Sequence, residues 1–370
     1  MARARVVLVA GTRPEVIKLA PVLAELRRRE WCEPLFVASA QHRELTDQAL
    51  ATFGLAADLD LDLMRPGQDL FDVSAGVLTR LRDPLRDLDP AAVLVQGDTT
   101  TVLFAALAAF YLGIPVGHVE AGLRSGDLAE PFPEEANRRL TSVVTRWHFA
   151  PSARARQALL AEGVAAERVF VTGNTAIDAV FSVRERPVDL AAAGVALDHE
   201  RPVVLVTVHR RESFGAPLQG ILTAVRRLAE RFSRVQFVLP VHPNPAVRAP
   251  VLRDLSGLPN LQLVEPLDYP VFAHLLDRAS FALSDSGGVQ EEGPALGTPV
   301  LVLRRVTERP EAVEAGGALL VGTEPGDIEA AASELLEDPA ALARLAAPRF
   351  PYGEGDASRR IADALEAALA

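Results

Sequence analysis

Cysteine is almost absent from this chain of 370 residues, because Cys32 is the only one. A lone cysteine excludes an intramolecular disulfide and a cysteine-rich zinc site. Long apolar runs are absent too: none reaches the roughly 18 residues that a membrane-spanning helix needs, and no signal-peptide pattern opens the chain. We therefore expect a cytoplasmic protein with no membrane partner.

Lysine is nearly absent as well, since Lys18 is the only lysine among 38 basic residues. The formal net charge of −11 at pH 7 argues against a nucleic-acid partner, which needs a basic surface. It does not argue against an anionic small molecule, because a local arginine cluster decides that binding. The single lysine in a chain that otherwise uses arginine marks position 18 as a candidate functional residue.

The chain has enough apolar residues for two full cores, with 49% hydrophobic residues over its length. Short apolar runs alternate with helical stretches, a pattern typical of parallel sheets covered by helices on both faces. We predict an α/β protein with two doubly wound, Rossmann-like domains. The first comprises residues 1–183 with a C-terminal helix, 356–370, that packs back on it, and the second comprises residues 184–355.

The clearest candidate for a ligand site is the stretch from Ser284 to Glu292, which follows a buried strand and opens a helix. Free N–H groups at that helix start, with the positive end of the helix dipole, form an anion site. Gly287 and Gly288 let a phosphate approach the main chain closely. Glu292 lies one turn further, where it can accept hydrogen bonds from ribose hydroxyls. The alternative is an ordinary strand-to-helix turn.

A second candidate lies at the first strand-to-helix turn, Gly11-Thr12-Arg13-Pro14-Glu15, after the predicted strand 6–10. Pro14 suits the first turn of a helix. Arg13 and Lys18 lie about a turn and a half apart near the start of this helix, so both can face the edge where the strand ends. The alternative is that they are solvated surface cations.

Carboxylates follow further strands of the first half. Asp98 comes after the predicted strand 92–95, Glu120 after the strand 114–119, and Glu134 opens the next helix. We assign them to three successive strand-to-helix junctions, which converge at one edge of a parallel sheet. For Asp98 the alternative is a helix N-cap, and for Glu134 it is a surface ion pair with Arg138 at i, i+4.

Histidines follow two strands of the second half: His209 after the strand 203–208 and His242 after the strand 235–239. A lone histidine at a strand end is usually structural. Two of them at the sheet edge that carries the diglycine turn favour a ligand site instead.

Further motifs complete the pattern along nearly the whole chain. In order they are Gln41-His42-Arg43, Gln96-Gly97-Asp98-Thr99-Thr100, His118-Val119-Glu120-Ala121-Gly122-Leu123-Arg124, Pro133-Glu134-Glu135-Ala136-Asn137-Arg138, Thr172-Gly173-Asn174-Thr175, His209-Arg210-Arg211-Glu212 and Thr307-Glu308-Arg309-Pro310-Glu311. Together with the two helix starts above, they resemble the non-hydrolysing UDP-N-acetylglucosamine 2-epimerases. The resemblance implies the GT-B fold, with its two domains facing a central cleft.

The resemblance also implies a reaction: reversible C2 epimerisation of UDP-N-acetylglucosamine to UDP-N-acetylmannosamine, by elimination of UDP to 2-acetamidoglucal and re-addition. It assigns proton chemistry to Asp98, Glu120 and Glu134, and the departing diphosphate to His209. Binding of UDP-N-acetylglucosamine and UDP falls to Arg13, Lys18, Arg138, Phe272, Ser286, Gly287, Gly288, Glu292 and Arg309. Gln41 and His42 match a regulatory motif. We expect a homodimer that needs no cofactor and no metal.

Alternative functions make different demands on the sequence. A hydrolysing epimerase shares the fold and would release N-acetylmannosamine, and a GT-B glycosyltransferase would use a UDP-sugar as donor. A non-catalytic UDP-sugar sensor would not need the carboxylates. An oxidising epimerase would need NAD and usually a Gly-x-Gly-x-x-Gly turn, which the sequence lacks. It also has no Tyr-x-x-x-Lys pair, because Pro14 lies four residues before the only lysine, Lys18.

Overall fold

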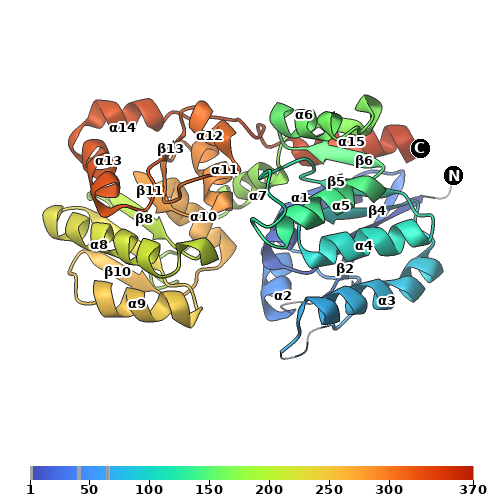
Figure 1. The fold of residues 1–370 in the computed structure, drawn as a ribbon, viewed down its shortest axis with the longest axis horizontal. Helices are drawn as coiled ribbons and strands as arrows, with labels where there is room; N and C mark the ends of the chain where they lie inside the picture. The colour runs from blue at the N-terminus through green and yellow to red at the C-terminus, as the bar shows by residue number, and fades with distance from the viewer. Residues whose placement is uncertain (1–2, 40–42, 64, 66, 370) are drawn as a thin grey trace. The chain divides into compact units, whose positions relative to one another are not determined.

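The computed structural model describes residues 3–39, 43–63, 65 and 67–369. The chain divides into two compact units: one runs up to Phe181 and includes the segment from Tyr352 onward, and the other is Ser182–Pro351. Each unit contains one parallel sheet with helices packed on it (Figure 1). The predicted α/β class with two doubly wound parallel sheets is therefore confirmed.

The sheet of the first unit has seven strands in the order β3-β2-β1-β4-β5-β6-β7. The order reverses beside β1, which pairs with both β2 and β4. Its central strands are continuous apolar runs without alternation, because helices cover both faces. The strands are β1 Ala4–Ala10, β2 Cys32–Ala38, β3 Leu59–Asp60, β4 Ala92–Gln96, β5 Val116–Val119, β6 Trp147–Ala150 and β7 Val169–Val171.

The helices of the first unit include one from the far end of the chain. Helix α15 packs against α1, and the carboxylate of Asp178 fixes its start by accepting hydrogen bonds from the backbone N–H groups of Ala357 and Ser358, at 3.2 and 2.8 Å. The helices are α1 Arg13–Arg27, α2 Arg43–Thr52, α3 Leu70–Leu88, α4 Thr100–Tyr111, α5 Glu134–Val144, α6 Ala153–Ala161, η1 Ala166–Arg168, α7 Thr175–Arg184 and α15 Ala357–Leu369.

The sheet of the second unit has six strands in the order β10-β9-β8-β11-β12-β13. Its strands are β8 Val203–Thr207, β9 Gln236–Pro240, β10 Leu261–Val264, β11 Phe281–Ser284, β12 Val300–Val302 and β13 Ala318–Leu320. Its helices are η2 Arg211–Ser213, α8 Ala216–Arg231, α9 Pro245–Leu255, α10 Tyr269–Arg278, α11 Gly287–Leu296, α12 Pro310–Glu314, α13 Pro325–Glu337 and α14 Pro339–Leu345.

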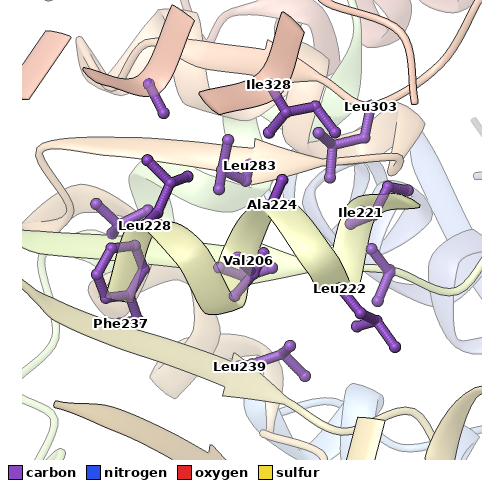
Figure 2. Close-up of a cluster of buried hydrophobic side chains, with 14 of the residues drawn as sticks. Val206, Ile221, Leu222, Ala224, Leu228, Phe237, Leu239, Leu283, Leu303 and Ile328 are labelled. Atoms are coloured by element: carbon purple, nitrogen blue, oxygen red, sulfur yellow. The ribbon is translucent and has the colours of Figure 1, made fainter. Parts of the chain in front are cut away.

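The core of the second unit lies between this sheet and helix α8. Figure 2 shows Ile221 and Leu228 of α8 directed at strand residues such as Phe237 and Leu283, all of them fully or almost fully buried. Their spacing along α8 gives the helix one apolar face. This packing fixes the sheet, so the segments that follow β8, β11 and β12 start from a rigid edge.

Three short strands, β3, β6 and β13, do not match any strand predicted from the sequence. Strand β3 has two residues, β13 exposes Leu319 and Leu320, and β6 contains His148, so none has the long apolar run that identifies a buried strand. Among the described residues, no helix combines the length and apolar character that crossing a membrane requires.

Candidate active site

Glu120 is the centre of the first polar cluster. It follows β5 with a φ of 66°, in the left-handed region that non-glycine residues rarely adopt. Its Oε2 pairs with Nζ of Lys18 and accepts hydrogen bonds from the side-chain amides of Gln96 and Asn174, both at 3.1 Å. The only lysine in the chain therefore lies on a buried carboxylate, and its predicted role at the UDP phosphates stays a prediction.

Gln96 and Asn174 were not predicted as site residues. Gln96 is the last residue of β4 and Asn174 follows β7, so both leave the sheet at the same edge as Glu120. Their position at strand ends was the available signal, since both lie in motifs that the sequence analysis singled out.

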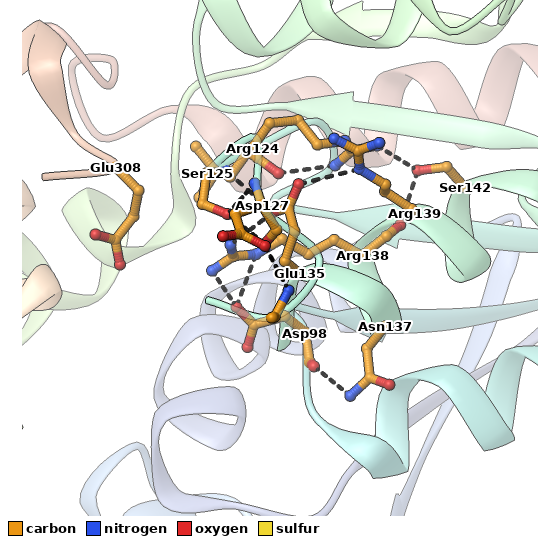
Figure 3. Close-up of polar contacts among 12 residues, drawn as sticks. Asp98, Arg124, Ser125, Asp127, Glu135, Asn137, Arg138, Arg139, Ser142 and Glu308 are labelled. Atoms are coloured by element: carbon orange, nitrogen blue, oxygen red, sulfur yellow. Dashed lines mark hydrogen bonds and ion pairs between the residues drawn. The ribbon is translucent and has the colours of Figure 1, made fainter. Parts of the chain in front are cut away.

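Asp98 is held by helix α5. Figure 3 shows Arg138 directed at its carboxylate, with Nε at 2.9 Å and Nη2 at 2.6 Å from Oδ2, while Asn137 donates to its backbone carbonyl at 2.9 Å. The N-cap of α4 is Thr99, so the N-cap alternative for Asp98 is wrong. Asp98 is instead half of a charge-assisted pair that fixes its orientation.

Arg138 is buried and does not lie at the surface, as its alternative interpretation as a surface partner of Glu134 would require. Its side chain is almost fully buried, and its Nη1 donates to Glu135 at 3.2 Å while its other nitrogens bond Asp98. The reason is the helix phase: Glu135 lies on the buried face of α5 and is completely inaccessible. Arg138 thus bridges two carboxylates inside the first unit.

Glu134 is the first residue of α5, and its Oε2 is buried without a hydrogen-bond partner among the described residues. It shares the β5–α5 connection with Glu120, so the three predicted carboxylates come from two junctions, not three. The cause is that residues 120–133 form a long connection without a strand of its own. A buried carboxylate oxygen without a partner is costly, which is typical of a group that meets a ligand.

His118 connects β5, which precedes Glu120, to the segment that carries Asp98. This β5 residue is fully buried, and its Nε2 lies 2.7 Å from the carbonyl oxygen of Gly97, next to Asp98. Burial lowers the pKa of His118 to about 4, because the charged ring is poorly solvated there. The ring is therefore neutral near pH 7. Its contact with Gly97 helps to hold the segment before Asp98 against β5.

Two further predictions concern the amino-terminal part of the chain. Arg13 is the first residue of α1 and is half-buried, directly after the turn that follows β1. Gln41 and His42, the predicted regulatory residues, lie outside the described residues.

Asp285 and His209 form the centre of the second polar cluster. Nδ1 of His209 lies 3.1 Å from Oδ1 of Asp285, which is completely inaccessible. Burial raises the pKa of Asp285, but hydrogen bonds from the ring and backbone of His209 outweigh it, so that pKa lies below its ordinary value. The ring of His242 stacks on that of His209 at 6.0 Å, as expected for neighbouring strand ends. Burial lowers the pKa of His242.

The start of α11 was predicted as a phosphate site. Among the described residues, Ser286 makes no side-chain cap hydrogen bond, so the first N–H groups of the helix lack that partner. A Cβ on Gly287 would lie 2.6 Å from Cζ of Arg309, and one on Gly288 would meet only Oγ of Ser286, at 3.9 Å. Gly287 therefore makes room for a guanidinium, and the predicted close approach of a phosphate stays a prediction.

Arg309 is fixed by two buried carboxylates. Its Nε donates to Glu291 at 2.7 Å, and its Nη1 lies 3.0 Å from Glu308. Glu308 also pairs with Arg304 at 2.7 Å. Burial alone would raise the pKa of the Glu308 carboxyl, but neighbouring arginine charges, first that of Arg309, hold that pKa well below its usual range. The cluster places a guanidinium against the helix start.

The predicted nucleoside contacts lie on neighbouring elements. Glu292 is buried, and its Oε1 accepts a hydrogen bond from the hydroxyl of Tyr269 at 3.1 Å. Phe272 is half-buried on the same helix as Tyr269, α10. Contacts of Glu292 with ribose and of Phe272 with uracil stay predictions.

Two Rossmann-like units, with polar side chains at the carboxyl ends of their strands, place the chain among the doubly wound α/β proteins that bind ligands at that edge. The family model described as UDP-N-acetylglucosamine 2-epimerase matches residues 24–366. A UDP-N-acetylglucosamine 2-epimerase of Yersinia pestis is 48% identical over 369 residues, which cover 98% of each chain. The chain belongs to the UDP-N-acetylglucosamine 2-epimerase family.

Solved structures agree with this assignment and with the predicted GT-B fold. The UDP-GlcNAc 2-epimerase from Neisseria meningitidis bound to UDP-GlcNAc has a TM-score of 0.92 and 44% identity, and the match covers 98% of this chain and 100% of that one. The S. aureus MnaA-UDP co-structure has a TM-score of 0.92 and 41% identity, and it covers 99% and 97% of the two chains.

Proposed function

We propose that the protein interconverts UDP-N-acetylglucosamine and UDP-N-acetylmannosamine without hydrolysing either. Family membership supports the epimerase activity, and the state of the first-unit carboxylates supports the route. Asp98 and Glu120 are each held by a cation, and Glu134 has a buried oxygen that has no partner among the described residues. A glycosyltransferase or a sensor has no need for three carboxylates in such different states.

The chemistry explains why carboxylates and cations are both present. The C2 proton of the sugar has no adjacent carbonyl, so its direct removal is too slow. Breaking the anomeric C–O bond instead sends the electron pair to UDP, while the C2 proton passes to a carboxylate and a C1=C2 double bond forms. Re-addition of UDP with proton delivery to the opposite face completes the epimerisation and balances charge and protons.

Negative charge develops on the departing UDP, and the second unit offers donors for it. The first N–H groups of α11, the guanidinium of Arg309 and the ring of His209 are the groups we assign to the diphosphate. Fixed donors at a site of developing charge typically contribute several kcal/mol to catalysis. Arg309 is already oriented by Glu291 and Glu308, so little reorganisation is needed.

The experiment that tests this function is incubation with UDP-N-acetylglucosamine in heavy water, without added cofactor or metal. We expect UDP-N-acetylmannosamine that carries deuterium at C2, together with a small amount of free UDP. Free N-acetylmannosamine as the main product would identify the hydrolysing reaction. Product that retains its original C2 hydrogen would contradict the elimination route.

We also propose a homodimer, supported by an exposed apolar face on the first unit. Helices α4 and α5 pack side by side, and Phe110, Tyr111, Leu140 and Val143 on them are 54–79% exposed. Contiguous apolar side chains of this size are typical of protein interfaces. Val143→Arg should therefore lower the mass measured by sedimentation equilibrium from that of two chains towards that of one, and an unchanged mass would contradict this interface.

A further inference from the structure

A buried carboxylate that the proposed reaction does not use lies beside His209. Asp285 follows β11 directly, at the point where β11 pairs with β8, and its side chain has no accessible surface. His209 follows β8 and keeps 37% of its side chain exposed. One residue of the pair is thus fixed in the protein, and the other reaches the surface of the second unit.

The hydrogen bonds of Asp285 define the orientation of the His209 ring. Its Oδ2 accepts from the backbone N–H groups of His209 and Arg210, at 3.0 and 2.9 Å, and from Oγ of Ser213 at 3.1 Å. Its Oδ1 accepts from the His209 backbone at 3.1 Å and faces Nδ1 at 3.1 Å. An ionised carboxylate only accepts hydrogen bonds, so Nδ1 carries the hydrogen and Nε2 is left on the far side of the ring.

The charged groups around this ring come from three segments. Asp285 from the β11–α11 turn supplies the negative charge, and His242 from the segment after β9 stacks on the ring. The guanidinium of Arg210, the next residue in the chain, is directed at Glu308, with Nη2 at 3.7 Å from Oε1. Among these described contacts, Asp285 is the group that faces Nδ1 of the ring.

We propose that Asp285 is the positioning residue of His209: it holds Nδ1 and so directs the Nε2 edge of the ring at the departing diphosphate. This inference rests on the proposed function, since it gives the ring its task. It extends that function to a residue that touches neither the substrate nor the reacting atoms. Asp285 acts through His209 alone, as a buried carboxylate does in other carboxylate–histidine pairs.

The test is Asp285→Asn, compared with Ser213→Ala as the matched control. The amide has to place its NH2 group against either the ring or a backbone N–H, so one of these donors loses its acceptor and the ring loses the negative charge beside Nδ1. We expect kcat for epimerisation to fall about 10²-fold or more, and the neutral ring of His209 to lose its preference for the Nδ1–H tautomer. Ser213→Ala removes a neutral donor from the same carboxylate and should leave that tautomer preference in place.

A double-mutant cycle separates positioning from folding. If Asp285 acts through His209, Asp285→Asn should change kcat little in a His209→Asn background. Equal effects in both backgrounds, or an unchanged tautomer preference of His209 in a folded Asp285→Asn enzyme, would overturn the inference while the proposed function stands. An inactive wild-type enzyme would instead refute the proposed function.

A measurement on the wild-type chain keeps the inference testable if Asp285→Asn does not fold. Nitrogen-15 NMR of histidine-labelled protein reports which ring nitrogen carries hydrogen, and the His209→Asn spectrum identifies the signal. We expect the Nδ1–H tautomer in the neutral ring. An Nε2–H tautomer would overturn the role of Asp285, with or without activity.

Discussion

The helix after β1 and the helix after β11 start in the same way, but groups of opposite charge lie against them. At α1, the carboxylate of Glu15 accepts hydrogen bonds from the backbone N–H groups of Gly11 and Thr12, at 2.6 and 3.2 Å. At α11, the group against the helix start is the guanidinium of Arg309, and Ser286 makes no side-chain cap within the described chain. Any helix start attracts anions, but the turn before α1 already holds the carboxylate of Glu15.

The two units also differ in how burial affects the pKa values of their ionisable groups. In the first unit, burial raises the pKa of Glu15 to about 7 and lowers that of His118 to about 4, so near pH 7 His118 is neutral and Glu15 is only partly ionised. In the second unit, Asp285 and Glu308 are as deeply buried, yet hydrogen bonds and arginines keep their pKa values below the ordinary range. The second unit therefore keeps two buried carboxylates ionised, and these fix His209 and Arg309, the donors that we assign to the diphosphate.

The largest expected effect is a fall in kcat. It tests whether the first unit carries out the reaction while the second unit binds UDP. Glu120→Gln keeps the size of the side chain but removes the base and the partner of Lys18, so kcat should fall by about 10²–10⁴ while UDP affinity changes little. Asp98→Asn and Glu134→Gln should act alike. Steady-state kinetics and calorimetry with UDP measure the two effects.

Asp83→Asn, at an exposed site on α3, is the control for these variants and should keep full activity. Deuterium uptake at C2 that persists unchanged in all three amide variants would remove the carboxylates from the mechanism. Loss of UDP affinity in step with kcat would contradict the division of roles between the units.

The sequence was sufficient for the architecture and for the residue types of the site. Alternating apolar runs and helices predicted two parallel sheets, and strand ends marked Asp98, Glu120 and His209. Such patterns depend on local periodicity and on the rule that polar residues follow the carboxyl ends of parallel strands. Neither the periodicity nor the strand-end rule requires knowledge of long-range contacts.

The pairings inside the site could not be predicted, because they join residues far apart in the chain. Lys18 and Glu120 are 102 positions apart, and Asp98 and Arg138 are 40 positions apart. Spacing offered only the alternative that Arg138 pairs with Glu134, since a helix pattern shows only neighbours three and four positions apart. The space beside Gly287 was likewise assigned to a ligand, because its filling by Arg309 depends on the tertiary fold.

The second prediction removes the positive charge beside α11. Arg309→Ala should weaken UDP binding by about 1.5–3 kcal/mol, the range of a charge-assisted hydrogen bond. Calorimetry with UDP measures the change. The control is Arg305→Ala, four residues earlier, whose side chain is 77% exposed, and which should bind UDP as the wild type does. Equal affinity of both variants would show that the contrast between the two helix starts has no role in binding.

The third prediction concerns the neutral groups of the first unit. Burial lowers the pKa of His148 from 6.5 to about 3. The unfolded chain takes up a proton below pH 6.5 and the folded chain does not, so stability is present above pH 6.5 and declines as the pH falls towards 3. His148→Phe should abolish this contribution, which amounts to about 2 kcal/mol between pH 6.5 and 5.

Urea unfolding at several pH values measures the acid sensitivity of His148→Phe. His199→Phe, at an exposed position of the second unit, is the control and should leave the wild-type dependence on pH unchanged. If His148→Phe loses as much stability on acidification as the wild type, the neutral state of this group in the first unit is refuted.

The smallest expected effect compares the two helix starts by one substitution. A Cβ on Gly11 would lie 2.4 Å from Oγ of Ser39 and 2.6 Å from Oγ1 of Thr101, and one on Gly287 would meet the guanidinium of Arg309. Overpacking costs typically 1–3 kcal/mol, and short hydroxyl side chains that can rotate favour the lower end, about 1 kcal/mol. Gly11→Ala should therefore lower the urea midpoint and leave UDP affinity unchanged, because its turn is already closed by Glu15.

Gly287→Ala should lower UDP affinity as well as stability. The added methyl group displaces the guanidinium that Glu291 and Glu308 fix, so UDP affinity falls several-fold, less than in Arg309→Ala, and the urea midpoint falls too. Gly326→Ala is the control for both, since its Cβ would meet nothing within 4 Å. If Gly11→Ala weakened UDP binding as much as Gly287→Ala, the α1 turn would also be a diphosphate site, and the carboxylate of Glu15 would not exclude anions from it.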